Sequence, residues 1–276
     1  MLTAQQVQDF RKNGFVNGGK VISESHADAL AKEVLRVLAD KDKTTVPQPV
    51  SISNLNKADA PVWQVVNIWE ASDLFRELLF HPPVVEAVQQ VLEGKQLRLW
   101  HDQIQYKPVS TGGVNMWHQD SPYWPCLTPK DQQVTCWIAL DDADVDNGCM
   151  SMIPGSHQWG NTIDFLHQIK SFEAMPKTFQ GHTLEVRLCP VKKGNMHLHH
   201  SLTWHGSHAN RSGRPRRAIA LHYMNERTVY CKVVNHPMEP FIAQSQAGVG
   251  TTIEGEHFPL VYSNGAVQQI VARPAT

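Results

Sequence analysis

The sequence has no excess of charge of either sign, because 25 lysines and arginines nearly balance 26 aspartates and glutamates. Proteins that bind nucleic acid or an anionic membrane through net charge carry a basic excess, so we expect neither partner. The chain also lacks an apolar run of membrane-spanning length, and it lacks the basic start and apolar stretch of a secretory signal peptide. These absences predict a soluble cytoplasmic protein, and nothing in the sequence indicates its oligomeric state.

Paired cysteines are absent as well. The five cysteines form an odd number and include no Cys-x-x-Cys motif. This excludes a disulfide framework and a thiolate zinc site, and it fits a reducing compartment. No internal repeat or low-complexity tract divides the chain. We therefore predict one domain over residues 1–276, with a mostly helical flank at 1–95, a β-rich core at 96–225 and a C-terminal extension at 226–276.

The first part of the chain carries helix signals. Thr3 and Gln6 have the spacing of a capping box, and Gly14 marks the end of the first helix. Residues 41–62 are polar and predict a loop with one short strand. Capping residues and apolar residues at helical spacing predict three further helices, at 24–40, 72–80 and 83–92.

From residue 96 onward the pattern changes to short strands. Turn residues separate them at short intervals, which is typical of a closed or sandwiched β architecture and not of a parallel α/β sheet. A polar, mixed segment at 160–182 interrupts the strands, and we expect it to lie over the mouth of a barrel. The predicted strands are 97–100, 103–106, 134–140, 149–153, 184–188, 196–199, 203–204 and 217–223.

The strongest chemical signal is a His-x-Asp motif, in which one residue separates His118 from Asp120. If both lie on one strand, their side chains project from the same face and can reach one metal ion. A surface turn in which Asp120 caps a backbone amide is the alternative, and for the tripeptide alone it is the stronger interpretation.

A possible third ligand makes the metal site a better interpretation than the surface turn. His205, followed by Gly206 and Ser207, is the best candidate for it. Two histidines and one carboxylate on one side of a metal, with open positions opposite, are typical of non-haem Fe(II) oxygenases. His197 and His199 could form a second metal pair on one strand, but no matching carboxylate stands near them in the sequence.

Three motifs follow one another along the chain: His118-Gln119-Asp120, Asn147-Gly148-Cys149-Met150 with Ile153-Pro154-Gly155-Ser156-His157, and His205-Gly206-Ser207. In this order they resemble the phytanoyl-CoA dioxygenase family, a branch of the Fe(II)/2-oxoglutarate oxygenases. The resemblance covers roughly residues 1–225. It implies a mainly β fold with flanking N-terminal helices, namely a double-stranded β-helix or cupin-like jelly roll. It also implies that His118, Asp120 and His205 are iron ligands.

The resemblance further implies an arginine that holds the distal carboxylate of 2-oxoglutarate. Arg216, eleven residues after His205, has the family's spacing, and a planar guanidinium can hold a carboxylate through two hydrogen bonds. Arg214 and Arg217 are rivals. However, Arg217 would face the opposite side of a strand, and Arg214 precedes Pro215 and is expected in a turn.

Three more positions match family residues near the co-substrate, and each has an ordinary alternative. Ser207 matches a hydroxyl that contacts 2-oxoglutarate, but it could simply lie in a turn. Lys107 matches a lysine near 2-oxoglutarate, but it could be solvated. Trp137 matches a tryptophan on the strand after the first metal motif, but it could be a core residue.

The residues just after the first metal motif are expected to border the substrate. Tyr123 and Trp124 would supply a rigid apolar wall, and Gln105 is a further candidate contact. Packing of the two aromatic rings at the barrel rim is an equally good interpretation.

The resemblance implies a dioxygenase that uses Fe(II), 2-oxoglutarate and O2. Such an enzyme oxidises a C–H bond of a small organic metabolite and releases succinate and CO2. Asp120 favours hydroxylation, because related halogenases have a small residue at that position. A divalent-metal hydrolase or isomerase is an alternative, but it would not need the clamp that Arg216 provides. A non-catalytic binding protein is another, but intact metal ligands argue against it.

Overall fold

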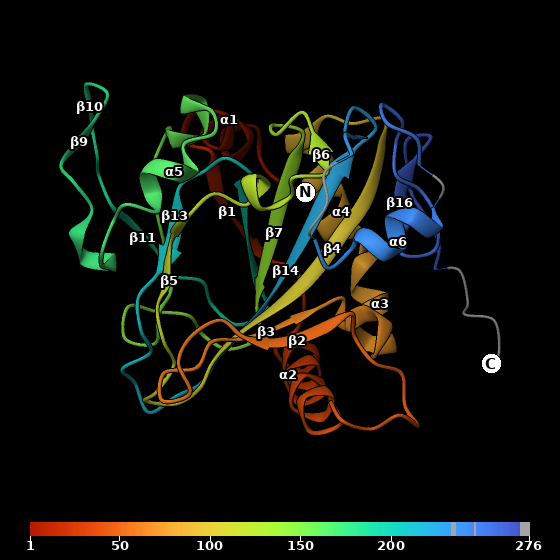
Figure 1. The fold of residues 1–276 in the computed structure, drawn as a ribbon, viewed down its shortest axis with the longest axis horizontal. Coiled ribbons are helices and arrows are strands. Elements are labelled where there is room, and N and C mark those ends of the chain that lie inside the picture. The colour runs from red at the N-terminus through yellow and green to blue at the C-terminus, as the bar shows by residue number, and fades with distance from the viewer. Residues whose placement is uncertain (233–235, 246, 271–276) are drawn as a thin grey trace.

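Two antiparallel sheets face each other in the computed structural model, which describes residues 1–232, 236–245 and 247–270. The larger sheet has the order β1-β12-β7-β14-β4-β16-β17, and β3 and β2 extend it beside β4. The smaller sheet has the order β11-β8-β13-β5 and lies to the left in Figure 1. This is a double-stranded β-helix with short N-terminal helices, so the predicted fold class is confirmed.

The strands of the larger sheet are β1 (Phe15–Lys20), β2 (Ser51–Asn54), β3 (Trp63–Val66), β4 (Gln96–Lys107), β7 (Gln133–Ala139), β12 (Asn195–His200), β14 (Arg216–Asn225), β16 (Leu260–Ser263) and β17 (Ala266–Val267). Those of the smaller sheet are β5 (Asn115–His118), β8 (Met150–Met152), β11 (Arg187–Cys189) and β13 (His205–Ser207). Two short pairs complete the strands: β6 (Leu127–Thr128) with β15 (Val229–Tyr230), and β9 (Thr178–Phe179) with β10 (His182–Thr183).

The helices are α1 (Ala4–Asn13), α2 (Glu24–Ala39), α3 (Asp73–Leu79), α4 (Pro82–Leu92), α5 (Ile163–Leu166) and α6 (Glu239–Gln244). The chain also forms the short 3-10 helices η1 (Ile68–Glu70), η2 (Ser121–Tyr123), η3 (Ser156–Trp159) and η4 (Phe172–Ala174). No helix in the described ranges combines the length and the apolar character needed to cross a membrane.

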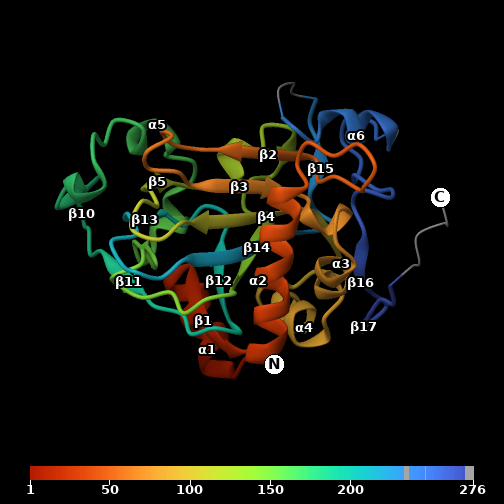
Figure 2. The ribbon, with the colours of Figure 1, turned by 90° about the horizontal axis from the view of Figure 1, so that it is seen from below.

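Helices α1 to α4 cover the outer face of the larger sheet, and Figure 2 shows α2 crossing its strands. Their apolar sides pack against alternate residues of the strands, including Leu99, Ile138 and Leu221, in the largest hydrophobic cluster. Each such side chain contributes roughly 1.5–3 kcal/mol when fully buried. The sheet is therefore held from outside, and the alternate positions on its inner face are left for polar side chains.

The predicted start and end of the first helix are confirmed. Thr3 and Gln6 form a capping box at the start of α1, and Gly14 ends the helix with a left-handed φ of 82°. Ser23 likewise caps α2 by accepting a hydrogen bond from the backbone N–H of His26. These helix ends could be predicted because their capping interactions join residues only a few positions apart in the sequence.

Replacing Gly14 by alanine should lower the free energy of unfolding by more than the strain of a left-handed backbone alone would cause. A Cβ atom at Gly14 would stand 2.5 Å from both Nδ1 of His157 and Oγ1 of Thr203. Strain of about 1 kcal/mol and overpacking of about 1–3 kcal/mol should add. Gly19 has a similar φ of 79° but open space around it, so Gly19→Ala is the control. Urea unfolding measures both variants, and equal losses would contradict the crowding argument.

Strand β4 is continuous, whereas the sequence predicted two strands at 97–100 and 103–106. The polar residue Asp102 is completely buried between these segments. Its carboxylate accepts hydrogen bonds from the backbone N–H groups of Ile68, at 2.8 Å, and Trp69, at 3.3 Å. A buried carboxylate with such partners does not interrupt a strand.

Other strand predictions were wrong in position. The predicted strand at 203–204 lies just before β13, and that predicted at 184–188 is shifted towards β11. Strand β3 was not predicted. These are short strands with few local signals, and pairing with distant strands decides where they form.

The 160–182 insertion does not cover the opening between the sheets as a whole. Its β9–β10 hairpin projects at the left of Figure 1, away from that opening. The insertion does contact the His-x-Asp loop. The Gln119 amide donates to the carbonyl oxygen of Gly160 and accepts from the N–H of Thr162. The hydroxyl of Tyr123 lies 2.8 Å from Nε2 of His167. The predicted position over the barrel mouth is therefore wrong for the hairpin.

Candidate active site

The structure brings His118, Asp120 and His205 together. Nε2 of His205 lies 3.4 Å from Oδ1 of Asp120, and Nε2 of His118 lies 3.8 Å from the same oxygen. One ligand atom from each residue lies within 4.8 Å of the others. No other group of three or more His, Cys, Asp or Glu side chains in the described ranges has this geometry. Three atoms this close can share one first-row metal ion at bond lengths of about 2 Å after small side-chain movements.

Strand pairing explains why these side chains meet. His205 on β13 pairs directly with His118 on β5. Asp120 lies beyond the end of β5, where the chain turns into η2. The backbone N–H groups of Asp120 and Ser121 donate to the carbonyl oxygen of Ser201, at 2.9 and 3.1 Å. His118 and Asp120 therefore do not share a strand face, contrary to the prediction, and a turn brings the carboxylate to the two imidazoles.

Backbone carbonyls set the tautomers of the two histidines. Nδ1 of His118 donates to the carbonyl oxygen of Met116 at 2.7 Å, and Nδ1 of His205 donates to that of Thr203 at 2.9 Å. A carbonyl only accepts, so each Nδ1 must carry the proton when the ring is neutral. The lone pair of each ring is then on Nε2, the atom that faces Asp120.

The protonation of two of the three side chains also suits a cation, whereas the pKa of His205 is raised because Asp120 outweighs the effect of burial. Burial, assisted by the neighbouring His205, lowers the pKa of His118 to about 3. Burial alone would raise the pKa of Asp120, but interactions with His205 and a hydrogen bond from His199 hold it well below its usual range. A neutral imidazole and an ionised carboxylate are the forms that bind metals.

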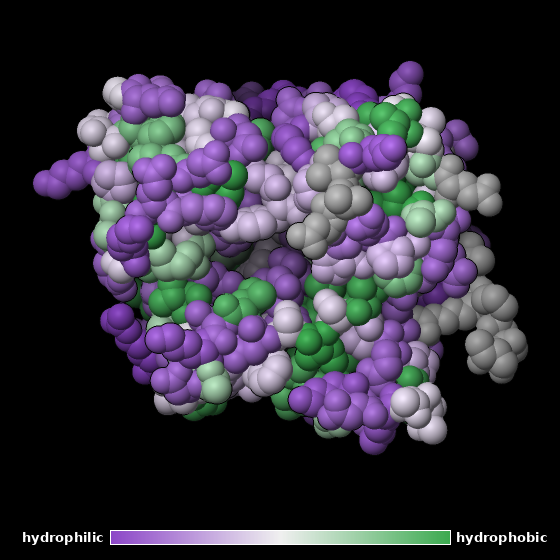
Figure 3. Space-filling model, in the orientation of Figure 1, coloured by the Kyte–Doolittle hydropathy of each residue, from purple (hydrophilic) through white to green (hydrophobic). Residues whose placement is uncertain are grey.

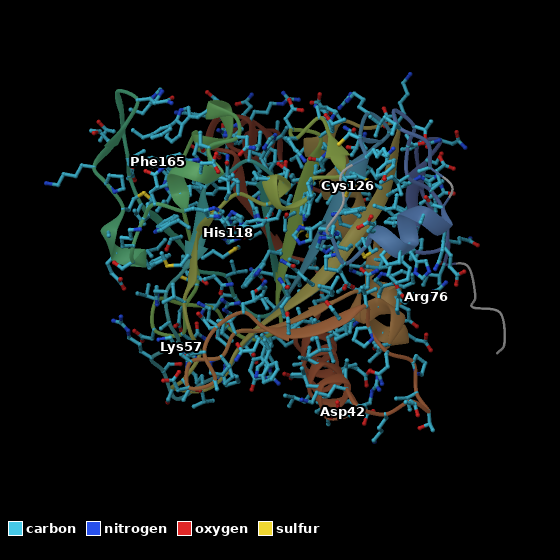
Figure 4. The ribbon with its side chains drawn as sticks, viewed as in Figure 1. Asp42, Lys57, Arg76, His118, Cys126 and Phe165 are labelled. Carbon is cyan, nitrogen blue, oxygen red and sulfur yellow. The ribbon has the colours of Figure 1, made fainter. Side chains whose placement is uncertain are left out.

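The site opens into a cavity between the two sheets, with about 410 Å³ of empty space. Figure 3 shows a hollow at the centre of this face, and Figure 4 shows His118 at its edge. Amide side chains line part of the wall, namely Gln103, Gln105 and Asn115. Apolar side chains line another part, namely Trp137, Met150 and Ala220.

Arg216 points into this cavity from the start of β14 and is only 2% exposed. Its Nη1 donates to the carbonyl oxygen of Gln105 and its Nη2 to Oγ of Ser207, both at 3.2 Å. The guanidinium lies 5.7 Å from the ring centre of Trp137. Its Nε has no hydrogen-bond partner among the described residues. Arg216, Ser207 and Trp137, which were assigned to one co-substrate from the sequence, thus lie close together, and Gln105, assigned to the substrate, lies beside them.

The two rival arginines lie elsewhere. Arg217 forms an ion pair with Asp141 at 2.7 Å, on the outer side of the sheet near α2. Arg214 is paired with Asp144 at 2.5 Å, in the turn before β14. Both already have carboxylate partners, so Arg216 is the arginine that remains for a ligand in the cavity.

Lys107 is fully buried beside Arg216, its direct partner across β4 and β14. Its ammonium group donates to the backbone carbonyl oxygens of Ser207 and His208. Burial and the nearby Arg216 hold the pKa of Lys107 well below its usual range. Lys107 is therefore not solvated. Its hydrogen bonds hold the backbone at the end of β13, the strand that carries Ser207.

The two predicted aromatic contacts differ from each other. Tyr123 is 49% exposed, and its ring lies 6.1 Å from that of His118, so it stands at the rim. Trp124 is buried and packs edge-on against His101 and His222. Trp124 therefore supports the cavity wall from behind.

A row of polar side chains on the inner face of the larger sheet was not assigned a role from the sequence. Thr135, His199 and His222 line the cavity opposite the smaller sheet. Polar residues at alternate positions of otherwise apolar strands are the signal that could have revealed them. His197, by contrast, lies 5.8 Å from His199 between ring centres and belongs to no metal-binding group in the described ranges.

The residues present fit both iron and 2-oxoglutarate. Two neutral imidazoles and a carboxylate form a donor set suited to Fe(II), with the cavity on the open side. Arg216 is a buried cation in the cavity lining that forms no ion pair within the described ranges, whereas Arg217 does. Such a pocket calls for an anion. A ligand carboxylate on Arg216 would meet this requirement and use the free Nε.

Comparison with known proteins gives the family. The family model described as Phytanoyl-CoA dioxygenase (PhyH) matches residues 10–218. Phytanoyl-CoA dioxygenase, peroxisomal, of Bos taurus is 25% identical over 252 residues, covering 84% of this chain and 72% of that protein. The Phytanoyl-CoA dioxygenase domain-containing protein 1 homolog of Caenorhabditis briggsae is 34% identical over 131 residues, 44% of each chain.

Solved structures agree with this result. The non-heme alpha ketoglutarate dependent carbocyclase SnoK from nogalamycin biosynthesis superposes with a TM-score of 0.75 and 26% identity. The superposition covers 94% of this chain and 96% of that one. With the family model covering most of its length and the fold matching throughout, the chain belongs to the phytanoyl-CoA dioxygenase family of Fe(II)- and 2-oxoglutarate-dependent oxygenases.

Proposed function

We propose that this protein hydroxylates, or otherwise oxidises, a C–H bond of a small organic metabolite and releases succinate and CO2. One observation carries the proposal: the His118, Asp120 and His205 side chains face a cavity that also contains the guanidinium of Arg216, whose Nε has no hydrogen-bond partner among the described residues. Metal ligands and a carboxylate clamp in one cavity are the two requirements of this chemistry.

Each residue has a defined task in the proposal. His118, Asp120 and His205 would hold Fe(II), and Arg216 with Ser207 would hold the far carboxylate of 2-oxoglutarate. When bound, these two groups and O2 supply the oxidising chemistry. The chain orients the co-substrate through Arg216 and shields the site from water with the Trp137 side of the cavity.

The cavity lining favours an uncharged, polar substrate. Apart from histidines, the only ionisable residues of the described lining are Asp120 and Arg216, and both are used by iron and co-substrate. The amides of Gln103, Gln105 and Asn115 each bond a neighbouring side chain, and their remaining N–H and C=O positions can form hydrogen bonds with a substrate. A charged group placed against this lining would have no counter-ion, which is costly in a buried site.

Succinate formation tests the proposal. Purified protein supplied with Fe(II), 2-oxoglutarate and O2 should form succinate slowly alone and faster with the true substrate. Screening metabolite pools by mass spectrometry should then reveal a product heavier by one oxygen. A metal hydrolase, an isomerase or a non-catalytic binding protein would form no succinate, and that result would refute the proposal.

A further inference from the structure

The two oxygens of the Asp120 carboxylate face different surroundings. Oδ1 points to the ligand histidines, at 3.4 Å from His205 and 3.8 Å from His118. Oδ2 points across the cavity to the larger sheet. There it accepts a hydrogen bond from Oγ1 of Thr135 at 2.6 Å and another from Nε2 of His199 at 3.1 Å. Only one oxygen is therefore left for a metal.

Strand register brings these donors into one row. His199 on β12 and His222 on β14 both pair with Thr135 on the intervening strand β7. Their side chains project to the inner face of the larger sheet, and each residue is at most 1% exposed. The row lies on three adjacent inner strands of the larger sheet, so strand pairing on both sides positions the donors.

The direction of each hydrogen bond follows from what each group can do. An ionised carboxylate only accepts, so the Thr135 hydroxyl and Nε2 of His199 must donate to Asp120. The Thr135 hydroxyl has a single proton and gives it to Asp120. Its oxygen must then accept from Nδ1 of His222, which lies 2.8 Å away. His222 therefore acts through Thr135, while His199 acts on the carboxylate directly.

We infer that the row of His199, Thr135 and His222 restricts Asp120 to binding iron through Oδ1 alone. Two donors on Oδ2 oppose rotation of the carboxylate and oppose its use of both oxygens on one metal. A carboxylate that chelated the ion would take a coordination position that the co-substrate or O2 needs. This inference rests on the proposed function and makes the three residues positioning residues for Asp120.

Matched variants can separate positioning from simple packing. Thr135→Val keeps the shape and removes the donor, whereas Thr135→Ser keeps the donor. His199→Phe and His199→Gln form a second such pair, which decides the question if Thr135→Val does not fold. Thr228→Val is the control, because Thr228 is also buried and its hydroxyl donates to the carbonyl oxygen of Gln132, outside the metal site.

The readout is Co(II) titrated into metal-free protein, with its visible spectrum reporting coordination number. Anaerobic Fe(II) with 2-oxoglutarate, measured by its charge-transfer absorption, is the second readout. Thr135→Val and His199→Phe should weaken Co(II) binding about 10- to 100-fold, as for other partners of metal ligands, and change both spectra. Thr135→Ser and His199→Gln should restore most of the affinity and the wild-type spectra. Thr228→Val should behave as wild type.

Combining His222→Phe with Thr135→Val tests whether His222 acts on Asp120 through Thr135. His222→Phe alone should weaken binding less than Thr135→Val, and it should add nothing to the double variant. If Thr135→Val and His199→Phe keep the Co(II) affinity and spectrum of Thr228→Val, the inference is overturned while the metal site stands. If wild-type protein binds no Co(II) or Fe(II), the proposed function fails first and the inference falls with it.

Discussion

An Asp120→Ala variant should form no succinate and should bind Fe(II) more than about 100-fold more weakly, since loss of a ligand exceeds loss of its partners. Two neutral imidazoles alone hold a divalent ion poorly. The substitution also leaves the Thr135 hydroxyl and Nε2 of His199 without their shared acceptor. Both effects weaken metal binding, so we expect this substitution to lower the affinity for Fe(II) more than any other single substitution at the site.

The measurement is anaerobic Fe(II) titration followed by succinate detection after O2 is added. Asp146→Ala is the matched control, because Asp146 is an exposed aspartate outside the cavity lining. Asp120→Asn retains the shape but not the charge, and it should bind metal more weakly than wild type. Full turnover by Asp120→Ala would remove Asp120 from the ligand set and contradict the proposed function.

The sequence predicted the parts of the fold that have local causes. Helices α1 and α2 were found because capping residues and helical periodicity act within a few residues of each other. His118 and Asp120 were found because the motif is contiguous. His205 and Arg216 followed from their spacing within the motifs that resemble the family, and the structure places them beside the same cavity.

The sequence could not predict features that depend on strand register. Thr135, His199 and His222 meet because β12 and β14 pair with β7 in one register, and a shift by one residue would turn each side chain to the other face. The position of Asp120 beyond the end of β5 was missed for a similar reason. Its backbone is held by the carbonyl oxygen of Ser201, which is distant in sequence.

Arg216→Met should separate binding of 2-oxoglutarate from stability. Loss of one partner of a buried ion pair costs about 3–5 kcal/mol, so 2-oxoglutarate should bind roughly 100- to 5,000-fold more weakly. Without ligand, however, Arg216 is a buried cation lacking an ion pair in the described ranges, and burial lowers its pKa to about 10. The ligand-free variant should therefore unfold at the same temperature as wild type, or higher.

Its neighbour Arg217 should give the opposite result, although the two residues are adjacent in sequence. Arg217→Met removes an ion pair with Asp141 and should lower the ligand-free unfolding temperature. It should leave intact the rise in unfolding temperature on adding 2-oxoglutarate and Mn(II), because Arg217 does not line the cavity. Thermal unfolding of both variants, with and without these ligands, provides the comparison. If Arg216→Met keeps the ligand-induced rise, or Arg217→Met loses it, the carboxylate clamp has been assigned to the wrong side of β14.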